Sequence, residues 1–459
     1  MRRSVLLAVF VSLLGIAKPA DWPLFGHDAM RSAVSADGAL TSANVARLAL
    51  RWHIVLGSVA DSAPIVVGDR LFQTSRDGTT YGIDAASGQI VWRFETHGPN
   101  ITTSVPAYDP ATRVLYVPGV DGNIHKLDPA DGHEQRGNGF PAAITLARDT
   151  EKNASPLNLA NGFLYAQTSG YIGDATPYIG HVVAIRLRDG VTTVFNSLCS
   201  SRRALIEPGS CDAQRAGMWS RAGVVVDSDP AMQGRIYAAT GNGPYDARAG
   251  NYGDSILSLA ADASRLLGAL TPDDYARLEA QDLDVGSSSP ALLPRQPDSA
   301  TPLLAVQGGK DGVLRLFDRA HLNGRPPLQT VPLDNELFSA PAVWTGPHAA
   351  TFVFLGLADG VHAFRLTTVN GTSRLTPVWR ASLAGAVQGT SPAVAGGMVF
   401  IATSGQLVAL DAQTGDRLWS GPLGQIHWES PAIAGGAVYC SDENGGLSAF
   451  ALTGRGGPA

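Results

Sequence analysis

The feature that most constrains this chain is a fifteen-residue pattern that occurs twice with the same layout. It reads GTTYGIDAASGQIVW at residues 78–92 and GQLVALDAQTGDRLW at residues 405–419. In each copy an alternating apolar stretch is followed by an Asp-x-x-Ser/Thr-Gly turn and a second apolar stretch that ends in tryptophan. Both copies therefore predict two strands joined by a tight turn.

Spacing along the chain extends this pattern into a repeat. Trp92 follows Trp52 by 40 residues, and Trp419 follows Trp379 by 40 residues. A period near 40 with about four strands per unit is typical of β-propeller blades. A Ser-Pro or Ser-x-Pro pair marks the inner strand of seven units, at 62–64, 104–106, 155–156, 289–290, 339–341, 391–392 and 430–431, and residues 224–227 begin an eighth unit without it.

The two ends of the repeat complement each other. The last unit ends at residues 446–454 without a tryptophan-bearing fourth strand, and the first is preceded by one at residues 48–56. We therefore predict an all-β fold, an eight-bladed β-propeller of four-stranded antiparallel blades in which the N-terminal strand closes the last blade. Such closure leaves no open sheet edge. Residues 21–459 are predicted to form this single domain.

Residues 1–20 are predicted to be a secretory signal peptide. Two arginines precede an apolar run at residues 4–16, and small residues at 15–17 or Ala20 offer a cleavage site. The run is too short for a permanent membrane helix, and no later run is long enough. No cysteine lies near the cleavage point for a lipid anchor. The expected location is therefore periplasmic or secreted, with no membrane span.

The net charge and the cysteines of the chain indicate which partners, cofactors and disulfides to expect. The net charge is −6 and no basic run occurs, which argues against nucleic acid as a partner. No CxxCH motif is present, so no haem is expected to be attached to the chain. In an exported protein we expect Cys199 and Cys211, which flank a polar loop, to form a disulfide. Cys440 lies in a strand pattern and is expected to be a small buried residue.

The repeat is interrupted between residues 195 and 290, where long insertions include the cysteine loop and a helix-like stretch at 271–281. Long loops on a rigid scaffold are where function concentrates. We therefore expect candidate functional residues in and around this interrupted region.

The repeat resembles the tryptophan-docking repeat of the pyrroloquinoline quinone (PQQ) propeller family, whose consensus is AxDxxTGxxxW. The copy at 405–419 matches it fully, and the copy at 78–92 has Gly82 for Ala and Ser87 for Thr. The segment DWPLFGHD at 21–28 is similar to the mature start of many members. The resemblance covers the mature chain and implies the propeller fold. It implies less about activity, because non-catalytic scaffolds share the repeat.

A closer resemblance is to the quinoprotein alcohol dehydrogenases, including relatives that oxidise polyvinyl alcohol. The segment Asp282-Leu283-Asp284-Val285-Gly286 is similar to one that implies a catalytic base at Asp282 and a metal ligand at Asp284. A base must lie within hydrogen-bond reach of the alcohol hydroxyl. The tryptophan that usually precedes the first acid is replaced by Gln281.

Two further segments carry the same resemblance. In Thr240-Gly241-Asn242, the resemblance implies that Asn242 offers its side-chain oxygen to the metal, and such oxygens suit Ca²⁺. In VQGGKDGVLRLFDR, it implies that Lys310 hydrogen-bonds the quinone oxygens of the cofactor. Each segment also has a purely structural alternative. Asn242 could lie in a turn that ends a strand, Asp282 and Asp284 could be solvated loop acids, and Lys310 could be a solvated lysine in a turn.

Two looser matches complete the expected site. The family's remaining metal ligand is a glutamate in blade three, for which Asp174 could substitute here, with one extra residue before the next strand. Trp219 is the candidate for the ring on which the cofactor stacks, although its spacing to the next strand differs from that in the family. The pair of adjacent cysteines that covers the cofactor in many members is missing here, as it is in some relatives.

These resemblances imply a dehydrogenase-like protein that uses PQQ and Ca²⁺ or a lanthanide to oxidise an alcohol or polyol and passes the electrons to a separate acceptor. One alternative is a non-catalytic propeller that binds proteins of the cell envelope. Another is a propeller that keeps the pocket but has lost turnover. The enzyme hypothesis requires Asn242, Asp282, Asp284 and Lys310 to face one cavity.

Overall fold

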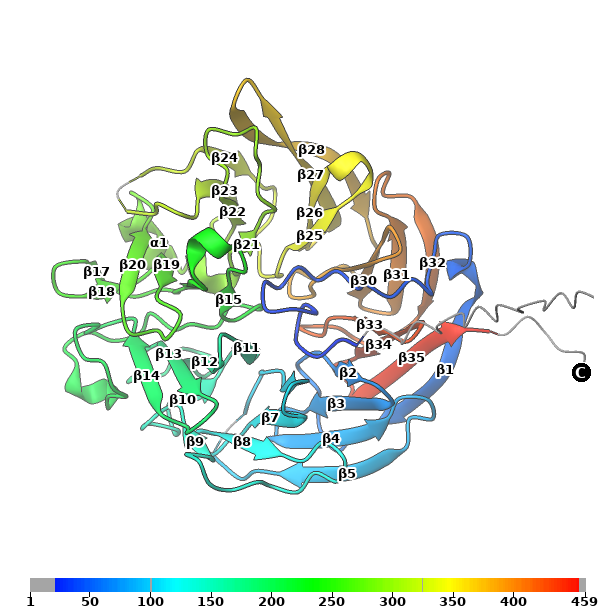
Figure 1. The fold of residues 1–459 in the computed structure, drawn as a ribbon, viewed down its shortest axis with the longest axis horizontal. Helices are drawn as coiled ribbons and strands as arrows, with labels where there is room; N and C mark the ends of the chain where they lie inside the picture. Colours follow the sequence, from blue (N-terminus) through cyan, green and yellow to red (C-terminus); the bar gives the residue numbers. More distant parts are fainter. Residues whose placement is uncertain (1–20, 100, 324, 454–459) are drawn as a thin grey trace, which may run out of the picture.

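The computed structural model of the protein describes residues 21–99, 101–323 and 325–453. Nearly all of its regular structure is β-strand, and eight antiparallel sheets stand side by side around a central axis (Figure 1). The predicted eight-bladed propeller is confirmed. The predicted signal peptide, residues 1–20, lies outside the described residues.

The first four blades follow one another in the sequence. Blade one contains β2 (Ile65–Val67), β3 (Arg70–Thr74), β4 (Thr79–Asp84) and β5 (Ile90–Glu95). Blade two contains β6 (Ala107–Asp109), β7 (Val114–Pro118), β8 (Asn123–Leu127) and β9 (Ala142–Ala143). Blade three contains β10 (Glu151–Asn153) and β11 (Asn158–Ala160), which both pair with β12 (Phe163–Gly170), and then β13 (His181–Arg186) and β14 (Thr192–Asn196). Blade four contains β15 (Val225–Val226), β16 (Ile236–Ala239), β19 (Ile256–Leu259) and β20 (Leu266–Leu270).

The second half of the ring has the same design. Blade five contains β21 (Ala291–Leu292), β22 (Leu304–Gln307), β23 (Val313–Asp318) and β24 (Gln329–Pro332). Blade six contains β25 (Ala342–Thr345), β26 (Thr351–Leu357), β27 (Gly360–Val369) and β28 (Thr372–Ser382). Blade seven contains β29 (Ala393–Ala395), β30 (Met398–Thr403), β31 (Gln406–Asp411) and β32 (Arg417–Pro422). Blade eight contains β33 (Ala432–Ala434), β34 (Ala437–Ser441), β35 (Gly446–Leu452) and β1 (Leu48–Val55).

Blade eight is closed as predicted, because its outermost strand comes from the other end of the chain. Strand β1 pairs antiparallel with β35, from Leu48 opposite Leu452 to Val55 opposite Gly446 (Figure 1). The pairing covers the edge that β35 would otherwise expose.

The elements outside the blades are few. A two-stranded hairpin of β17 (Tyr245–Asp246) and β18 (Asn251–Tyr252) lies within the insertion in blade four. Short 3₁₀ turns occur at Val45–Arg47, Pro208–Ser210, Pro230–Met232, Val285–Ser287 and Pro347–Ala349. Among the described residues, α1 (Tyr275–Gln281) is the single α-helix, and no helix is long and apolar enough to cross a membrane.

The docking repeat has a direct physical meaning in this fold. Each repeat tryptophan lies on an outer strand, and its indole N–H donates to a backbone carbonyl of the adjacent blade. The pairs are Trp52 with Ala85 (3.0 Å), Trp92 with Pro129 (3.1 Å), Trp379 with Ala412 (3.2 Å) and Trp419 with Leu48 (2.9 Å). The turn glycine lies under the ring: a Cβ on Gly415 would come 2.6 Å from Trp379, and the glycine also has a φ of +79°.

The copy of the repeat at residues 78–92 has Gly82 where the consensus has alanine, and the packing of blade one explains this difference. Gly82 lies opposite Trp92 in the β4–β5 pair, as Ala409 lies opposite Trp419 in β31–β32. The indole of Trp92 covers Gly82 so closely that a Cβ there would come 2.1 Å from the ring. Glycine at this position therefore fits the packing of blade one.

Serine side chains near the axis join neighbouring blades. The hydroxyl of Ser104 donates to the carbonyl of Ser155 (2.7 Å), and that of Ser288 donates to the carbonyl of Ser339 (2.7 Å). These bonds explain why serine precedes so many of the inner strands. The apolar core lies mostly between adjacent blades; Phe354 of blade six, for example, shares a buried cluster with Val399 of blade seven.

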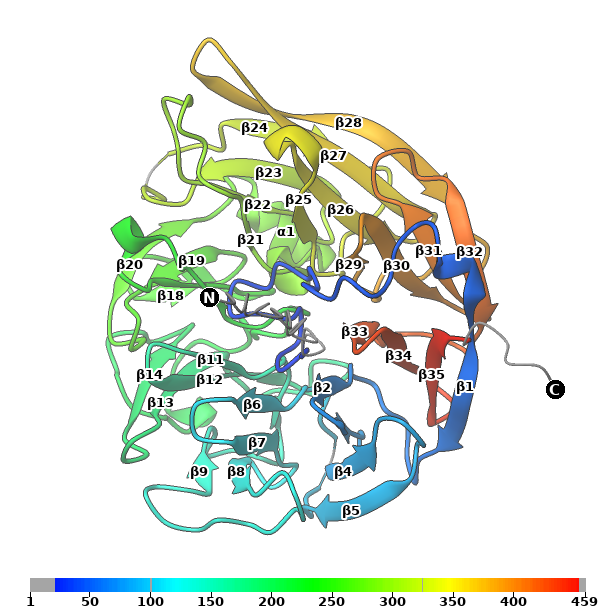
Figure 2. The same cartoon turned by 45° about the vertical axis from the view of Figure 1, so that its right-hand side comes forward.

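An N-terminal segment, residues 21–44, crosses the centre of the ring (Figures 1 and 2). Its backbone hydrogen-bonds inner strands of blades one, four, six and seven, through Trp22 with Val66, Ala29 with Val226, Ser32 with Val343, and both Ala33 and Ser35 with Val394. The segment therefore ties together blades that are far apart in the sequence.

Both cysteine predictions are confirmed. Cys199 and Cys211 form a disulfide with an S–S distance of 2.01 Å. Cys440 is a buried free cysteine in β34.

Candidate functional site

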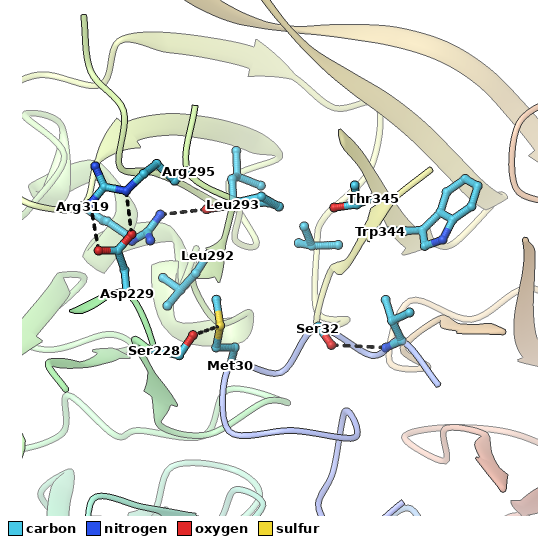
Figure 3. A pocket seen from close by; sticks show the side chains of 13 residues that line it. Met30, Ser32, Ser228, Asp229, Leu292, Leu293, Arg295, Arg319, Trp344 and Thr345 are labelled. Carbon is cyan, nitrogen blue, oxygen red and sulfur yellow. Dashed lines mark hydrogen bonds and ion pairs between the residues drawn. The ribbon is translucent and has the colours of Figure 1, made fainter. Parts of the chain in front are cut away.

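Two of the larger cavities among the described residues differ in character. The first, of about 490 Å³, lies between the N-terminal segment and blades four to six (Figure 3). Its charged groups are already paired: Arg295 donates to Asp229 at 3.0 and 2.8 Å, and Arg319 donates to the buried Asp227. The remaining lining is largely apolar, with Met30, Leu292 and Trp344 prominent (Figure 3). This cavity therefore has few polar groups that are free to bind a ligand.

The second cavity, which we call the central cavity, has a volume of about 390 Å³, within the range of roughly 300–1,000 Å³ common for small-molecule sites. Loops and inner strands from most of the ring line it, with no contribution from the described residues of blade seven. The lining includes five residues that the sequence predicted, namely Asp174, Trp219, Asp282, Asp284 and Lys310.

The end of α1 places the two acids of the DLDVG segment. Asp282 follows the last helical residue with a left-handed φ of 56°, and its side chain is 66% exposed. Asp284 then begins the 3₁₀ turn at Val285–Ser287, and its side chain is only 7% exposed. Gly241 makes room for this carboxylate, because a Cβ there would come 2.2 Å from Asp284 Oδ1. The two acids thus differ sharply in access to solvent.

Asn242 and Lys310 join these acids into one network. The backbone N–H of Asn242 donates to Asp284 Oδ1 (2.6 Å), and its side-chain amide donates to Asp282 Oδ1 (2.5 Å). Lys310 Nζ lies 3.2 Å from Asp282 Oδ2 and also contacts Asp284 Oδ2. The structure therefore connects the four residues in one network, in which Asp282, Asp284 and Lys310 line the central cavity, whereas Asn242 is not among the lining residues.

Burial shapes the electrostatics of this network. Burial raises the pKa of Asp284, and the ammonium of Lys310 only partly offsets the effect. Burial also works against the charge of Lys310, but the carboxylates of Asp284 and Asp282 outweigh it and raise the lysine pKa. Lys310 therefore stays a cation at neutral pH.

An aromatic wall stands beside the lysine. Lys310 Nζ lies 5.3 Å from the centre of the Trp219 ring. Trp219, Phe338 and Trp428 contact one another with centroid separations of 5.7 to 6.3 Å. All three line the cavity, so a planar ligand would meet both an aromatic surface and a fixed cation.

Asp174 reaches the same cavity from an exposed loop between β12 and β13. Its carboxylate accepts a hydrogen bond from the hydroxyl of Tyr178 (2.9 Å). Burial of Tyr178, with this carboxylate beside it, raises the tyrosine pKa. Asp174 therefore lines the cavity, but its hydrogen-bond partner is Tyr178 and not a member of the Asn242 network.

Two cations of the cavity were assigned no role from the sequence. Burial lowers the pKa of Lys152 to about 8. Arg221 is 2% exposed, donates to the carbonyl of Trp428 (2.7 Å) and lies 5.2 Å from that ring. Lys152 is one of only four lysines in the chain, a signal that could have singled it out, whereas Arg221 has no motif.

Asp254 was also missed, although it lies in the interrupted region. It is 1% exposed, and its Oδ1 accepts a hydrogen bond from the backbone N–H of Val285 (3.2 Å). Its Oδ2 has no hydrogen-bond partner among the described residues. Burial raises its pKa to about 8, aided by the charge of Asp284. Its sequence context, NYGDS, gave no chemical hint.

The cavity suits the groups that the resemblance implies. The side-chain oxygen of Asn242 is buried without a partner among the described residues, and carboxylates lie beside it. Such oxygens are the ligands that Ca²⁺ prefers. Lys152, Arg221 and Lys310 offer positive charge to an anionic, carboxylate-bearing ring system. The residues therefore fit both a hard cation and PQQ.

Comparison with known proteins agrees with the fold and the repeat. The family described as outer membrane protein assembly factor BamB, whose members carry PQQ-type repeats, matches residues 18–168 and 367–456. These ranges make up more than half of the chain. The chain belongs to this PQQ-repeat family.

Individual relatives include both dehydrogenases and an assembly factor. The chain is 22% identical to polyvinylalcohol dehydrogenase from Pseudomonas sp. over 481 aligned positions, which cover 84% of this chain and 74% of that protein. The europium-containing methanol dehydrogenase has a similar fold, with a TM-score of 0.69 at 15% identity, covering 94% of this chain and 98% of that one. BamB from Moraxella catarrhalis reaches 0.56 at 14% identity, covering 90% and 99%. At these identities the two structures show a shared fold.

Proposed function

We propose that this protein is a PQQ-dependent dehydrogenase that oxidises an alcohol or polyol. The observation that carries the proposal is the network of Asn242, Asp282, Asp284 and Lys310, in which the two acids and the lysine line the central cavity together with Trp219. The similarity to a polyvinylalcohol dehydrogenase over most of the chain supports it.

Asp282 is the proposed catalytic base. Its exposed carboxylate can meet a substrate hydroxyl, whereas the carboxylate of Asp284 is buried. Asn242 and Lys310 each contact one oxygen of Asp282, which fixes the carboxylate in orientation. In this position Asp282 would accept the proton that the alcohol hydroxyl loses.

Lys310 and the aromatic wall form the proposed cofactor site. PQQ, when bound, supplies the quinone that accepts two electrons from the alcohol. Trp219 would face its ring system, and Lys310 would hydrogen-bond its quinone oxygens. Lys152 and Arg221 would neutralise its carboxylates, because both cations line the cavity and Arg221 is almost fully buried there.

The proposed metal ligands are Asn242 Oδ1 and Asp284, with Asp174 as a further candidate. Asn242 already has a free, buried oxygen, whereas Asp284 would exchange its contact with Lys310 for the metal. Asp174 would have to give up its bond to Tyr178. The hard oxygen set suits Ca²⁺ or a lanthanide.

The proposal includes an exported location, which rests on the predicted signal peptide at residues 1–20. It also includes a separate electron acceptor, because the chain lacks a haem-attachment motif.

The second candidate function is that of a non-catalytic scaffold for proteins of the cell envelope. The description of the matching family and the fold similarity to BamB favour it. The absence of adjacent cysteines from the sequence is consistent with it.

A binding and turnover assay separates these functions. Purified protein is titrated with PQQ in the presence of Ca²⁺ or a lanthanide, with quenching of tryptophan fluorescence as the readout of binding, and is then assayed for dye-linked oxidation of a panel of alcohols and polyols. Binding with turnover supports the dehydrogenase. Binding without turnover indicates a pocket that has lost its activity, and neither binding nor turnover contradicts the proposal and favours the scaffold. The Lys310→Met variant should lose binding if the titration reports on this cavity.

A further inference from the structure

A second cluster of potential metal ligands lies where blade eight meets blade one. Asp61 precedes β2, His427 precedes β33, and Glu443 follows β34. One ligand atom from each lies within 4.8 Å of the other two. His427 Nδ1 is 3.2 Å from Glu443 Oε1 and 3.7 Å from Asp61 Oδ1. The cluster shares no residue with the Asn242 network.

The protein leaves the oxygens of this cluster unsatisfied. The side chain of Asp61 is 2% exposed, and its Oδ1 has no hydrogen-bond partner among the described residues. The same holds for Oε1 of Glu443. Arg76 Nε approaches the other oxygen of Asp61 only to 3.9 Å. Burying a carboxylate oxygen without a hydrogen-bond partner is unfavourable, so a bound cation would stabilise this arrangement beyond the longer-range charges of Lys152 and Arg221.

We propose that Asp61, His427 and Glu443 bind a divalent transition-metal ion of the zinc class. A tetrahedral ion with ligands at about 2.1 Å separates neighbouring ligand atoms by about 3.4 Å, close to the two distances observed around His427. An imidazole nitrogen with carboxylate oxygens suits Zn²⁺ better than Ca²⁺, which prefers an all-oxygen set. His427 is 52% exposed, which gives the ion a path from solvent.

The position of the cluster indicates what the ion does. Blade eight contains the first and last strands of the described residues, β1 and β35, and it adjoins blade one through β33 and β2 (Figure 1). An ion held by one ligand from blade one and two from blade eight joins these blades at the junction that closes the ring. Because Asp61 and His427 also line the central cavity, the same ion fixes part of its wall. This inference does not depend on the proposed dehydrogenase activity.

Calorimetric titration of Zn²⁺ into the chelator-treated, tag-free protein, without PQQ, tests the site. Wild-type protein should bind one ion at this cluster. Since changing even an indirect partner of a metal costs about 10–100-fold in affinity, His427→Ala and Asp61→Asn should each weaken binding by at least about 100-fold. His133→Ala is the matched control, because His133 lies exposed in the turn after β8 of blade two, and it should bind like wild type.

A thermal melt with and without Zn²⁺ supplies an independent readout. Zn²⁺ should raise the melting temperature of wild-type and His133→Ala protein and leave that of His427→Ala unchanged. Asn242→Ala should keep the response, because Asn242 belongs to the other network. Equal Zn²⁺ binding by wild type and His427→Ala, no binding by wild type, or loss of binding in Asn242→Ala alone would each overturn the proposal.

Discussion

Tryptophan has two uses in this protein, one at the periphery of the ring and one at its centre. Trp52, Trp92, Trp379 and Trp419 lie on outer strands, cover a glycine or contact an apolar neighbour, and donate to a carbonyl of the next blade. The central tryptophans instead line a cavity and face cations, Trp219 beside Lys310 and Trp428 beside Arg221.

The difference shows that regularly spaced tryptophans and irregularly spaced ones have different roles in this protein. The four peripheral tryptophans occur in two pairs spaced 40 residues apart, because the blades that carry them dock on the next blade in the same way. Trp219 lies in the interrupted stretch between β14 and β15, where no blade needs it for docking. Periodic residues therefore hold the ring together, and aperiodic residues near the axis carry the proposed chemistry. Four predictions test this division.

The largest expected effect belongs to Asp282→Asn. Loss of a general base costs about 10²–10⁴-fold in rate, so kcat for alcohol oxidation should fall by about 10³-fold. The side chain is 66% exposed, so the melting temperature should stay near that of wild type. Stopped-flow dye reduction and a thermal melt measure the two effects. Retention of more than a tenth of the wild-type rate would remove Asp282 from the role of base.

Trp92→Leu should show the opposite profile. It removes a packed indole that contacts Gly132 and Phe72 and leaves the carbonyl of Pro129 without its donor. We expect a loss of about 2–4 kcal/mol in the free energy of unfolding, measured by urea denaturation. PQQ affinity measured below the unfolding transition should not change. A variant that is as stable as wild type but fails to bind PQQ would contradict the purely structural role of the peripheral tryptophans.

Trp219→Leu tests the central tryptophan directly. Loss of an aromatic face from a ligand site costs about 1 kcal/mol or somewhat more, so PQQ affinity should weaken by about tenfold. Stability should change less than in Trp92→Leu, because the Trp219 ring borders the cavity and is only half-buried. Equilibrium dialysis gives the affinity independently of tryptophan fluorescence. A loss of stability equal to that of Trp92→Leu, with affinity unchanged, would make Trp219 a structural residue.

The smallest effect is a pH dependence of cofactor binding. The pKa of Lys152 is lowered to about 8 by burial, and a bound anion should raise it again. PQQ affinity should therefore be full below pH 8 and should fall several-fold as the pH rises above 8, where the free protein loses this charge. The Lys152→Met variant should bind more weakly and show a flatter profile. An identical pH profile in both proteins would exclude Lys152 as the titrating group.

The fold was predictable from the sequence because the repeat encodes it redundantly. The same closed ring is indicated by the two 40-residue tryptophan spacings, by the Ser-Pro pairs, and by the extra strand at the start of the repeat that the last unit lacks. The use of Gly82 in place of alanine could not be foreseen, because it depends on how Trp92 lies across its neighbouring strand. The course of residues 21–44 across the ring also had no periodic signal.

The candidate site was predictable only where a motif marks it. Asn242, Asp282, Asp284 and Lys310 lie in short recognisable segments, and the structure brings them together. Arg221 and Asp254 have no such segment; their importance comes from burial and neighbours contributed by distant blades. The roles of Asp174 and Trp219 remain predictions, although both line the cavity.

The most direct test of the division between ring and centre is a crystal structure of the protein with PQQ and Ca²⁺. The account predicts PQQ in the central cavity against Trp219, with Lys310 hydrogen-bonded to it and Ca²⁺ on Asn242 and Asp284. The docking tryptophans at the periphery should keep their present partners. PQQ bound in the cavity of Figure 3, or a central cavity that stays empty at saturating PQQ, would contradict the account.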